Sequence, residues 1–589
     1  DRAGRSATDR GITTAVPRYA ALGWLVVAVI SAAAVDVSDG TGARVAWVFS
    51  ALGAAATAAF AWSARSWQAR FAGVALGCAA ASAPATVGTL AHGVGRDRTG
   101  VFGLMLAVAL PVLIGAAVAQ LGHTRFGRNN KFSGSGDGAT GPASVIARRH
   151  LVLSWVCLAV LGYSVIGIVA ITMRGSWTST WGALSAASIA ALAVAGLATT
   201  AAHAVARRPH PHAGRWPIAV QVLALIALAV TTTAMMHADR PASGALSVQQ
   251  QMIGFDVPGE WTWSQLVTNW RVDALFGPIV VLMVVAYLEG VRRIHARGDA
   301  WPIGRTVSWL IGCLGVAVIT CTGVNRYAYG QFTVHMILHM GLNLFIPALL
   351  VMGGAVTLAL RVLPSHRNGR THAAHASQSA DGSGRARAGS GPATLPGPRE
   401  WIMALVHARF TRLLCNPLVA ITVYIVTLYG LYFSGIFDWA VRAPWGHEWM
   451  TAHFLITGYL FYWPIVGIDP GPKRLPHVGR LGVLFAIMPF HAFFGIAVMS
   501  MSGALGDTFY SALGILGPAA IDHQQTVAGG IAWASGELPL LMVFLSLAVQ
   551  WGRSDQRTAA RHDRQADRYG DDELDSYNAM LKELQDQRR

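Results

Sequence analysis

Long apolar runs constrain this chain more than any other feature. Fourteen segments of about 20 residues or more are dominated by aliphatic and aromatic side chains, which is the length an α-helix needs to cross a bilayer. A helix satisfies its own backbone hydrogen bonds in lipid, so we predict an all-α polytopic membrane protein. The predicted spans are residues 18–36, 44–62, 71–92, 100–122, 150–173, 180–206, 216–237, 275–291, 302–323, 333–360, 416–436, 449–468, 481–500 and 528–551.

Composition supports this class and excludes others. Of the 589 residues, 53% are hydrophobic and 13% are charged, whereas soluble domains are about 25% charged. The net charge of +16 comes from arginines in short loops between the apolar runs, so we expect the lipid bilayer as a partner and no nucleic acid. The five cysteines are scattered and form no Cys-x-x-Cys motif, which argues against a disulfide framework. The Ala-, Gly- and Arg-rich composition is typical of a high-GC bacterium, and we expect a multi-pass protein of the bacterial plasma (inner) membrane.

The distribution of basic residues predicts the orientation. If the N-terminus is cytoplasmic and the spans alternate, the outer segments hold only eight of the 45 Lys and Arg residues. Cytoplasmic loops of membrane proteins carry the excess of Lys and Arg. We therefore expect both termini in the cytoplasm and about fourteen transmembrane helices in two seven-helix halves.

Loop composition suggests where the chain divides. A segment with Trp261, Trp263 and Trp270 is expected to lie at the outer membrane interface, where tryptophan is favoured. A Gly-, Ser- and His-rich stretch is too polar to bury a core and is expected to be a disordered cytoplasmic linker. The predicted parts are a seven-helix domain at 1–240, the interfacial segment at 241–274, a second seven-helix domain at 275–551 with its linker at 364–399, and a charged cytoplasmic tail at 552–589.

The most informative motif is QFTVHMILHM at residues 331–340. Its histidines, His335 and His339, are four residues apart and therefore share one face of the predicted helix. Met336 and Met340 follow them, and add thioether sulfur on the next face. Imidazole and thioether ligands together suit copper, especially Cu(I).

Further polar residues are predicted on the same, outer side of the membrane. His453 lies one turn into its span, with His447 just before it, and His491 lies in the middle to outer half of the following span. A single membrane histidine is more often a hydrogen-bonding packing residue, but several at similar depth favour a metal or cofactor site. Methionines alone would be ordinary core residues, and a membrane carboxylate could orient a histidine, carry protons or pair with a neighbour. The predicted metal ligands are His335, His339, Met336, Met340, His453, His491, His523 and Glu537.

At these residues the second half, about 270–551, resembles the CtaG-type cytochrome c oxidase assembly factors. The resemblance rests on the segments HMILHMGLNLFIPALLVMGG, AHFLITGYLFYWPIVGIDP, MPFHAFFGIAVM and DHQQTVAGGIAWASGELP. It implies a protein that supplies copper to the catalytic copper centre of the oxidase. The positions that correspond to family motifs are His335, His339, His453, His491, Asp522, Trp533 and Glu537, and His523 is less typical there. The first half resembles, through RRHLVLSWVCLAVLGYSVIGIVAITM, the CopD copper-resistance membrane domain, a fusion found in actinobacteria.

These patterns together predict a copper-binding assembly factor that is not an enzyme. It would take Cu(I) from an extracytoplasmic copper donor and deliver it to cytochrome c oxidase subunits at the outer face of the membrane. Three alternatives stay open at this point: a haem-binding membrane redox protein, a copper transporter, and a structural partner that steadies the oxidase.

Overall fold

A computed structural model describes most of the chain, and within the described residues all regular structure is helical. The described part runs from residue 24 to residue 588, without residues 26, 30, 37–40, 64–66, 84, 86, 127–141, 174–176, 207–214, 242–243, 365–396, 472–474 and 570–571. Most of the predicted linker 364–399 and part of the first predicted span, 18–36, therefore lie outside the described residues. The prediction of an all-α membrane protein is confirmed.

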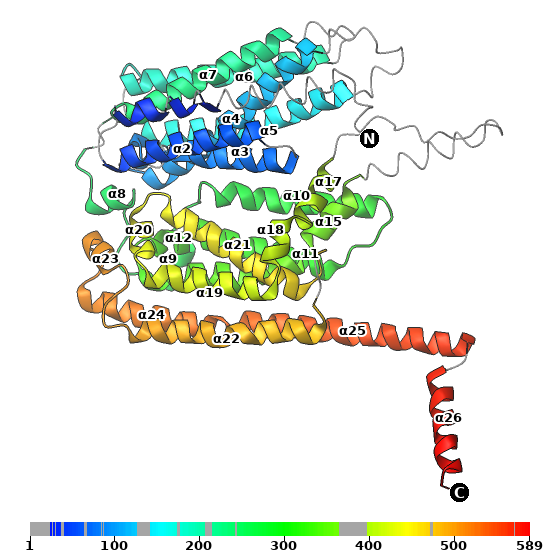
Figure 1. Cartoon of the computed structure of the whole chain (residues 1–589). Helices are drawn as coiled ribbons and strands as arrows, with labels where there is room; N and C mark the ends of the chain where they lie inside the picture. Colours follow the sequence, from blue (N-terminus) through cyan, green and yellow to red (C-terminus); the bar gives the residue numbers. More distant parts are fainter. Residues whose placement is uncertain are drawn as a thin grey trace, which may run out of the picture.

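The first half forms a bundle of its own around the buried residues of α4, α5, α6 and α7, and it is the upper, blue to teal layer of Figure 1. Its closest helix pairs are α6 with α7 and α4 with α5. Its helices are α2 (Thr41–Ser63), α3 (Trp67–Ser82), α4 (Arg96–Phe126), α5 (Pro142–Thr172), α6 (Thr180–Ala206) and α7 (Arg215–His237).

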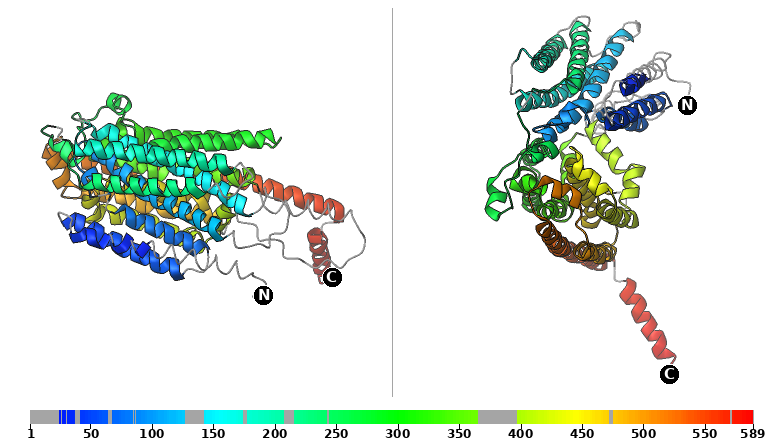
Figure 2. Two further views of the ribbon diagram at one scale, coloured as in Figure 1. Left: turned by 90° about the horizontal axis from the view of Figure 1, so that it is seen from above. Right: turned by 90° about the vertical axis from the view of Figure 1, so that its left-hand side faces the viewer.

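The second half builds a larger core from the green to orange helices of Figure 1. The right-hand view of Figure 2 shows the two groups of helices side by side, seen nearly end-on. The main helices of this half are α10 (Phe276–Ala296), α11 (Ile303–Cys321), α13 (Phe332–Met340), α14 (Ile346–Met352), α15 (Ala355–Val362), α19 (Pro417–Phe433), α21 (Gly446–Val466), α22 (His477–Ser500), α24 (Pro518–Ser535) and α25 (Glu537–Tyr569). The remaining helices after α15 include α17 (Pro398–Val406), α18 (Arg409–Leu414), α20 (Ile436–Arg442) and the C-terminal α26 (Asp572–Asp586).

Nine helices of the described residues are long and apolar enough to cross a membrane, or ten if the bent pair of α19 and α20 counts as one span. The helices α10 and α21, each of 21 residues, occupy two further predicted spans. The total of fourteen spans and the cytoplasmic placement of both termini stay predictions, as do the domain limits.

The run predicted as a single span at 333–360 is interrupted twice. A π-helical turn at Gly341–Phe345 separates α13 from α14, which begins with Pro347 in its first turn. A second break at Gly354, whose φ is +65°, separates α14 from α15. Single π turns inside helices occur frequently at functional sites, and this one follows His339 almost directly.

Short helices cover one end of the second bundle, at the left of Figure 1. They are α8 (Val248–Met252), α9 (Trp263–Thr268), α12 (Gly323–Ala328) and α23 (Asp507–Leu513). Capping boxes stabilise the N-termini of α8 and α9. In α8 the side chains of Ser247 and Gln250 accept from each other's backbone N–H groups, and in α9 those of Thr262 and Gln265 do the same. In the orientation predicted from the basic residues, this covered end is the outer one.

The two halves meet at that end through the start of α4. Asp97 forms an ion pair with Arg271, and both side chains are almost completely buried. The backbone N–H of Gly95 donates to the carbonyl of Gly254 at 2.7 Å, and Arg98 donates to the carbonyl of Val272 at 2.9 Å. The first half is thus tied to the loop segment that precedes α10.

Candidate metal centre

Two of the histidines predicted to bind a metal lie together on α13. The ring centroids of His335 and His339 are 4.3 Å apart, as their spacing of four residues requires. The start of α13 is fixed to α24, because the hydroxyl of Thr333 donates to the carbonyl of Gln524 at 3.1 Å. The amide of Gln524 in turn donates to Gln331 Oε1 at 3.0 Å. The pair of rings therefore has a defined position in the bundle.

A third ring comes from the second residue of α21. The ring centroid of His447 lies 5.0 Å from that of His335 and 5.7 Å from that of His339. One nitrogen from each ring can be chosen so that the three lie within 4.8 Å of one another. We call His335, His339 and His447 the histidine triad. Such a group is compact enough for one ion to contact all three imidazoles.

The triad is buried and its nitrogens lack partners. His335 and His339 are 0% exposed and His447 is 3% exposed. The carbonyl of Ala328 lies near His335 and His447, yet none of the six ring nitrogens makes a hydrogen bond of good geometry within the described residues. Buried polar atoms are almost always paired, and a group of unpaired ones calls for a bound ion or water. The donor set therefore fits a metal ion.

Aromatic side chains surround the triad and exclude water. Phe437 lies 5.3 Å from His335, Phe454 lies 4.9 Å from His339, and Tyr329 stacks on His447 at 3.9 Å, between ring centroids. No carboxylate belongs to the ligand group within the described residues. Three imidazoles in an apolar shell suit a borderline or soft transition metal such as copper or zinc, and they suit calcium or magnesium poorly.

Close packing between α21 and the π turn places His447 against the α13 pair. A Cβ atom on Gly458 would lie 2.3 Å from the carbonyl oxygen of Asn343 and 2.8 Å from Pro347. Only glycine permits this approach. The triad therefore depends on a contact that lies about one turn after His339, in the π turn, and about three turns after His447 on α21.

His453, which the sequence suggested as a ligand, lies outside the triad. Its half-buried ring stacks on Trp449 at 5.3 Å and meets Phe454 edge-on at 5.4 Å. His447 is six residues earlier and takes the place beside His335 and His339. The sequence did offer a signal for His447, namely its depth in the membrane. His335 lies in the first turn of α13 and His447 in the first turn of α21, so both are close to the same end of the bundle.

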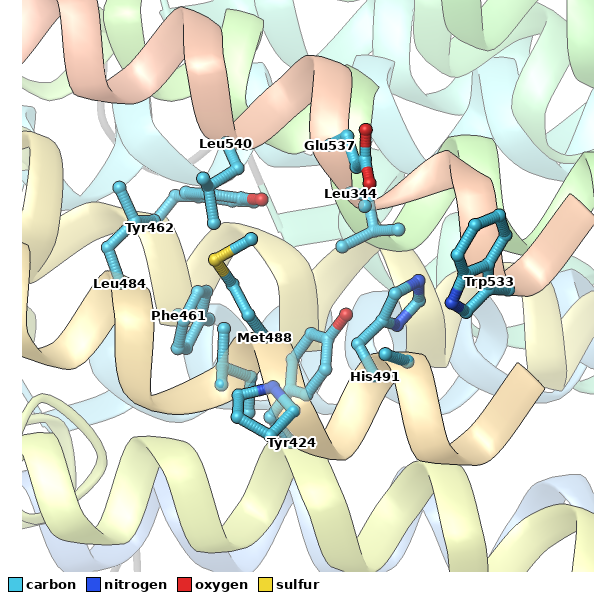
Figure 3. A pocket seen from close by; sticks show the side chains of 14 residues that line it. Leu344, Tyr424, Phe461, Tyr462, Leu484, Met488, His491, Trp533, Glu537 and Leu540 are labelled. Carbon is cyan, nitrogen blue, oxygen red and sulfur yellow. The ribbon is translucent and has the colours of Figure 1, made fainter. Parts of the chain in front are cut away.

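The remaining predicted ligands lie elsewhere. His491 and Glu537 line a separate cavity, which is shown in Figure 3, and His523 is exposed on α24. Met336 and Met340 are buried in the core of the second half. Within the described residues, the group of possible metal ligands around the triad includes neither His491, His523 nor Glu537. The role of all five residues as ligands stays a prediction.

Buried acidic and basic groups lie at the junction between the two halves. Burial raises the pKa of Asp273, even though the backbone N–H groups of Leu275 and Phe276 donate to its carboxylate at 2.7 Å. Burial likewise lowers the pKa of Arg240 to about 10. The junction between the halves is thus a desolvated polar region.

Comparisons with known proteins place this site in a sequence context. The chain is 44% identical over 384 residues to the uncharacterized protein Mb0105 of Mycobacterium bovis and to the uncharacterized protein MT0111 of Mycobacterium tuberculosis. Each alignment covers 64% of this chain and 54% of the relative. A third relative, the uncharacterized protein ML1998 of Mycobacterium leprae, is 43% identical over 338 residues, or 57% of this chain and 48% of the relative.

The chain therefore spans about half the length of the curated relatives it matches. No solved structure matches it. The resemblance of the first half to the CopD domain stays a prediction. Residues 285–554, which carry the whole histidine triad, match the family of cytochrome c oxidase caa3 assembly factors (Caa3_CtaG).

Proposed function

We propose that this protein binds copper at His335, His339 and His447 and delivers it to cytochrome c oxidase during assembly. The observation that carries the proposal is the set of three buried imidazoles whose nitrogens make no hydrogen bond of good geometry to any described residue. These imidazoles lie inside the region that matches an oxidase assembly family. The role is binding and transfer of a metal ion and requires no catalytic step.

The chemistry of the triad favours Cu(I) as the bound ion. Neutral imidazoles add no negative charge, so a monovalent ion leaves less net charge buried in the aromatic shell than a divalent one. Copper that must be handed on also needs exchangeable ligands. The triad draws its ligands from α13 and α21, so a small separation of the two helices would open the site.

The position of the triad supports transfer at the outer face. His335 and His447 lie in the first turns of their helices, below the short helices α9 and α12 that cover the predicted outer end. An extracytoplasmic copper donor and the oxidase subunit would then approach from the same side, in the plasma membrane of a bacterium. Met336 and Met340 lie on the same helix, but their buried positions give them no contact with an approaching partner.

Metal analysis of the purified full-length chain tests this proposal. We expect about one Cu(I) per chain after anaerobic loading, and loss of that copper in the double variant His335→Ala/His339→Ala and in His447→Ala. His453→Ala is the matched control, because it removes an imidazole from the same helix α21 but from outside the triad.

Two results would contradict the assignment. Equal copper content in the wild type and in His447→Ala would exclude the triad as the binding site. A red protein with a Soret band would support the haem-binding alternative instead. For the delivery step, the same variants should reduce the copper content and activity of the oxidase in cells, whereas uptake of copper into vesicles would support the transporter alternative.

A further inference from the structure

A second site lies apart from the histidine triad, in a cavity of about 240 Å³ inside the second bundle. Its walls come from α19, α21, α22 and the junction of α24 with α25. Figure 3 shows the aromatic and sulfur-containing side chains that enclose it. Its aromatic, sulfur-containing and ionisable lining residues include Tyr424, Phe461, Met488, His491, Trp533 and Glu537.

Two buried polar atoms of this cavity have no partner. Tyr424 is 2% exposed and His491 is 5% exposed, and neither Tyr424 Oη nor His491 Nδ1 forms a hydrogen bond in the described part of the chain. The other ring nitrogen, His491 Nε2, lies 3.4 Å from Ser535 Oγ. Unpaired buried polar atoms that border an otherwise apolar space indicate a missing ligand.

The contact with Ser535 determines which ring nitrogen of His491 donates a hydrogen bond and which one accepts. The Ser535 hydroxyl donates to the carbonyl of Ala532 at 3.0 Å, so its oxygen accepts from His491 Nε2. In the neutral ring Nδ1 is then an acceptor. Tyr424 Oη can donate and accept. The cavity therefore suits a ligand that donates a hydrogen bond to His491 Nδ1 and accepts one from Tyr424 Oη.

The helices are built to leave this space open. Gly536 separates α24 from α25, and a Cβ atom there would lie 2.7 Å from His491 Cδ2. Any larger residue would push the imidazole into the cavity. The absence of a side chain at Gly536 thus makes room for the ring of His491.

Depth and exposure show how a ligand would enter. His491 lies fourteen residues after His477 and nine before Ser500, at the two ends of α22, which places it well inside the hydrocarbon layer at about 1.5 Å per residue. At the rim, Trp533 is 48% exposed and Glu537 is also exposed. A carboxyl group on a lipid-facing surface is costly and marks a functional position. The cavity therefore opens toward the bilayer.

We propose that this cavity binds the head of a membrane-soluble quinol. The space is smaller than the roughly 300–1,000 Å³ of sites that enclose a whole ligand, so it takes a ring and leaves an apolar tail in the lipid. The phenolic hydroxyl of a hydroquinone donates to His491 Nδ1 and its oxygen accepts from Tyr424. Aromatic walls from Phe461 and Trp533 match a flat ring.

Calorimetric titration of the purified full-length chain with 2-methyl-1,4-naphthohydroquinone, kept reduced under nitrogen, tests the proposal. We expect saturable binding, and about tenfold weaker binding of the oxidised quinone, which has no proton to give His491 and leaves a buried acceptor unpaired. Tyr424→Phe should weaken quinol binding about five- to tenfold because one hydrogen bond is lost.

Tyr432→Phe is the matched control. It makes the same change on α19, to a buried hydroxyl that also has no hydrogen-bond partner among the described residues. Tyr432, however, lies beside His335 and Phe437. The control should keep wild-type quinol affinity. Copper content should be normal in Tyr424→Phe, so the result is independent of the function proposed above.

Three outcomes would overturn the quinol site. They are the absence of saturable binding to the wild type, an unchanged affinity in Tyr424→Phe, and competition by dodecanol at the same concentration as the quinol. The last outcome would assign the cavity to a lipid alcohol, because an aliphatic hydroxyl could make both hydrogen bonds without a ring.

Discussion

Gly458 offers a sharp test of the link between packing and the histidine triad, because it touches none of the three rings. In Gly458→Ala the added Cβ atom would start 2.3 Å from the carbonyl oxygen of Asn343. Real Cβ contacts are essentially never shorter than 3.0 Å. The helix α21 or the π turn must therefore move by at least about 0.7 Å at this contact.

That movement is large compared with the tolerance of a metal site. Ligand positions must be held to about 0.5 Å, and loss of supporting contacts typically costs 10- to 100-fold in metal affinity. We expect the Cu(I) affinity of Gly458→Ala to fall by about that factor. Overpacking should also destabilise the protein by about 1–3 kcal/mol.

Competition with a Cu(I) chelator of known affinity measures the first effect, and thermal unfolding in detergent measures the second. Gly430→Ala is the control. Gly430 lies in the neighbouring helix α19, and a Cβ atom added there would have no heavy atom within 4 Å outside its own helical turn. If Gly458→Ala lost stability but kept wild-type copper affinity, the reasoning that α21 packing positions His447 would be refuted.

Two further predictions concern the junction between the halves. Replacing Asp97 by Asn should leave the buried guanidinium of Arg271 without its ion-pair partner, and we expect a loss of about 3–5 kcal/mol. The midpoint of thermal unfolding checks this, with Glu289→Gln, an exposed ion-pair partner on α10, as the control; equal midpoints for both variants would contradict the buried ion pair. Burial raises the pKa of Asp273 in the folded state, so the folded protein binds this proton more tightly than the unfolded chain, and stability should fall as the pH rises above the ordinary value of 3.8. Asp273→Asn removes that titration, and unfolding midpoints measured from pH 4 to pH 8 should vary less than in the wild type; an unchanged pH profile would count against the raised pKa.

The sequence was sufficient for the features that depend on local order. Apolar runs longer than a bilayer is thick predict helices, and the described residues contain α-helices at the predicted spans from 44–62 onward. The pairing of His335 with His339 follows from the 3.6-residue turn alone. Motif resemblance indicated the assembly-factor family, and residues 285–554 match that family.

The composition of the triad depended on how helices rotate and slide against one another. His447 and His453 are six residues apart on α21. The sequence could not decide which of them lies beside His335 and His339, because that depends on the depth at which α21 packs against α13. The contact of Gly458 with the π turn sets that depth, and a π turn leaves no periodic pattern in the residues that form it.

His491 and Glu537 show the same limit of sequence reasoning, because the structure places these two predicted ligands outside the triad. Both were predicted as ligands of one metal site together with His335 and His339, but α22 and α25 turn them into a separate cavity. Sequence patterns report the depth of a residue along a helix, whereas the direction in which it points across the bundle is settled by the packing of neighbouring helices. For this protein the chain alone determined its all-helical character and which two histidines pair, and only the tertiary structure decided that His447 joins them.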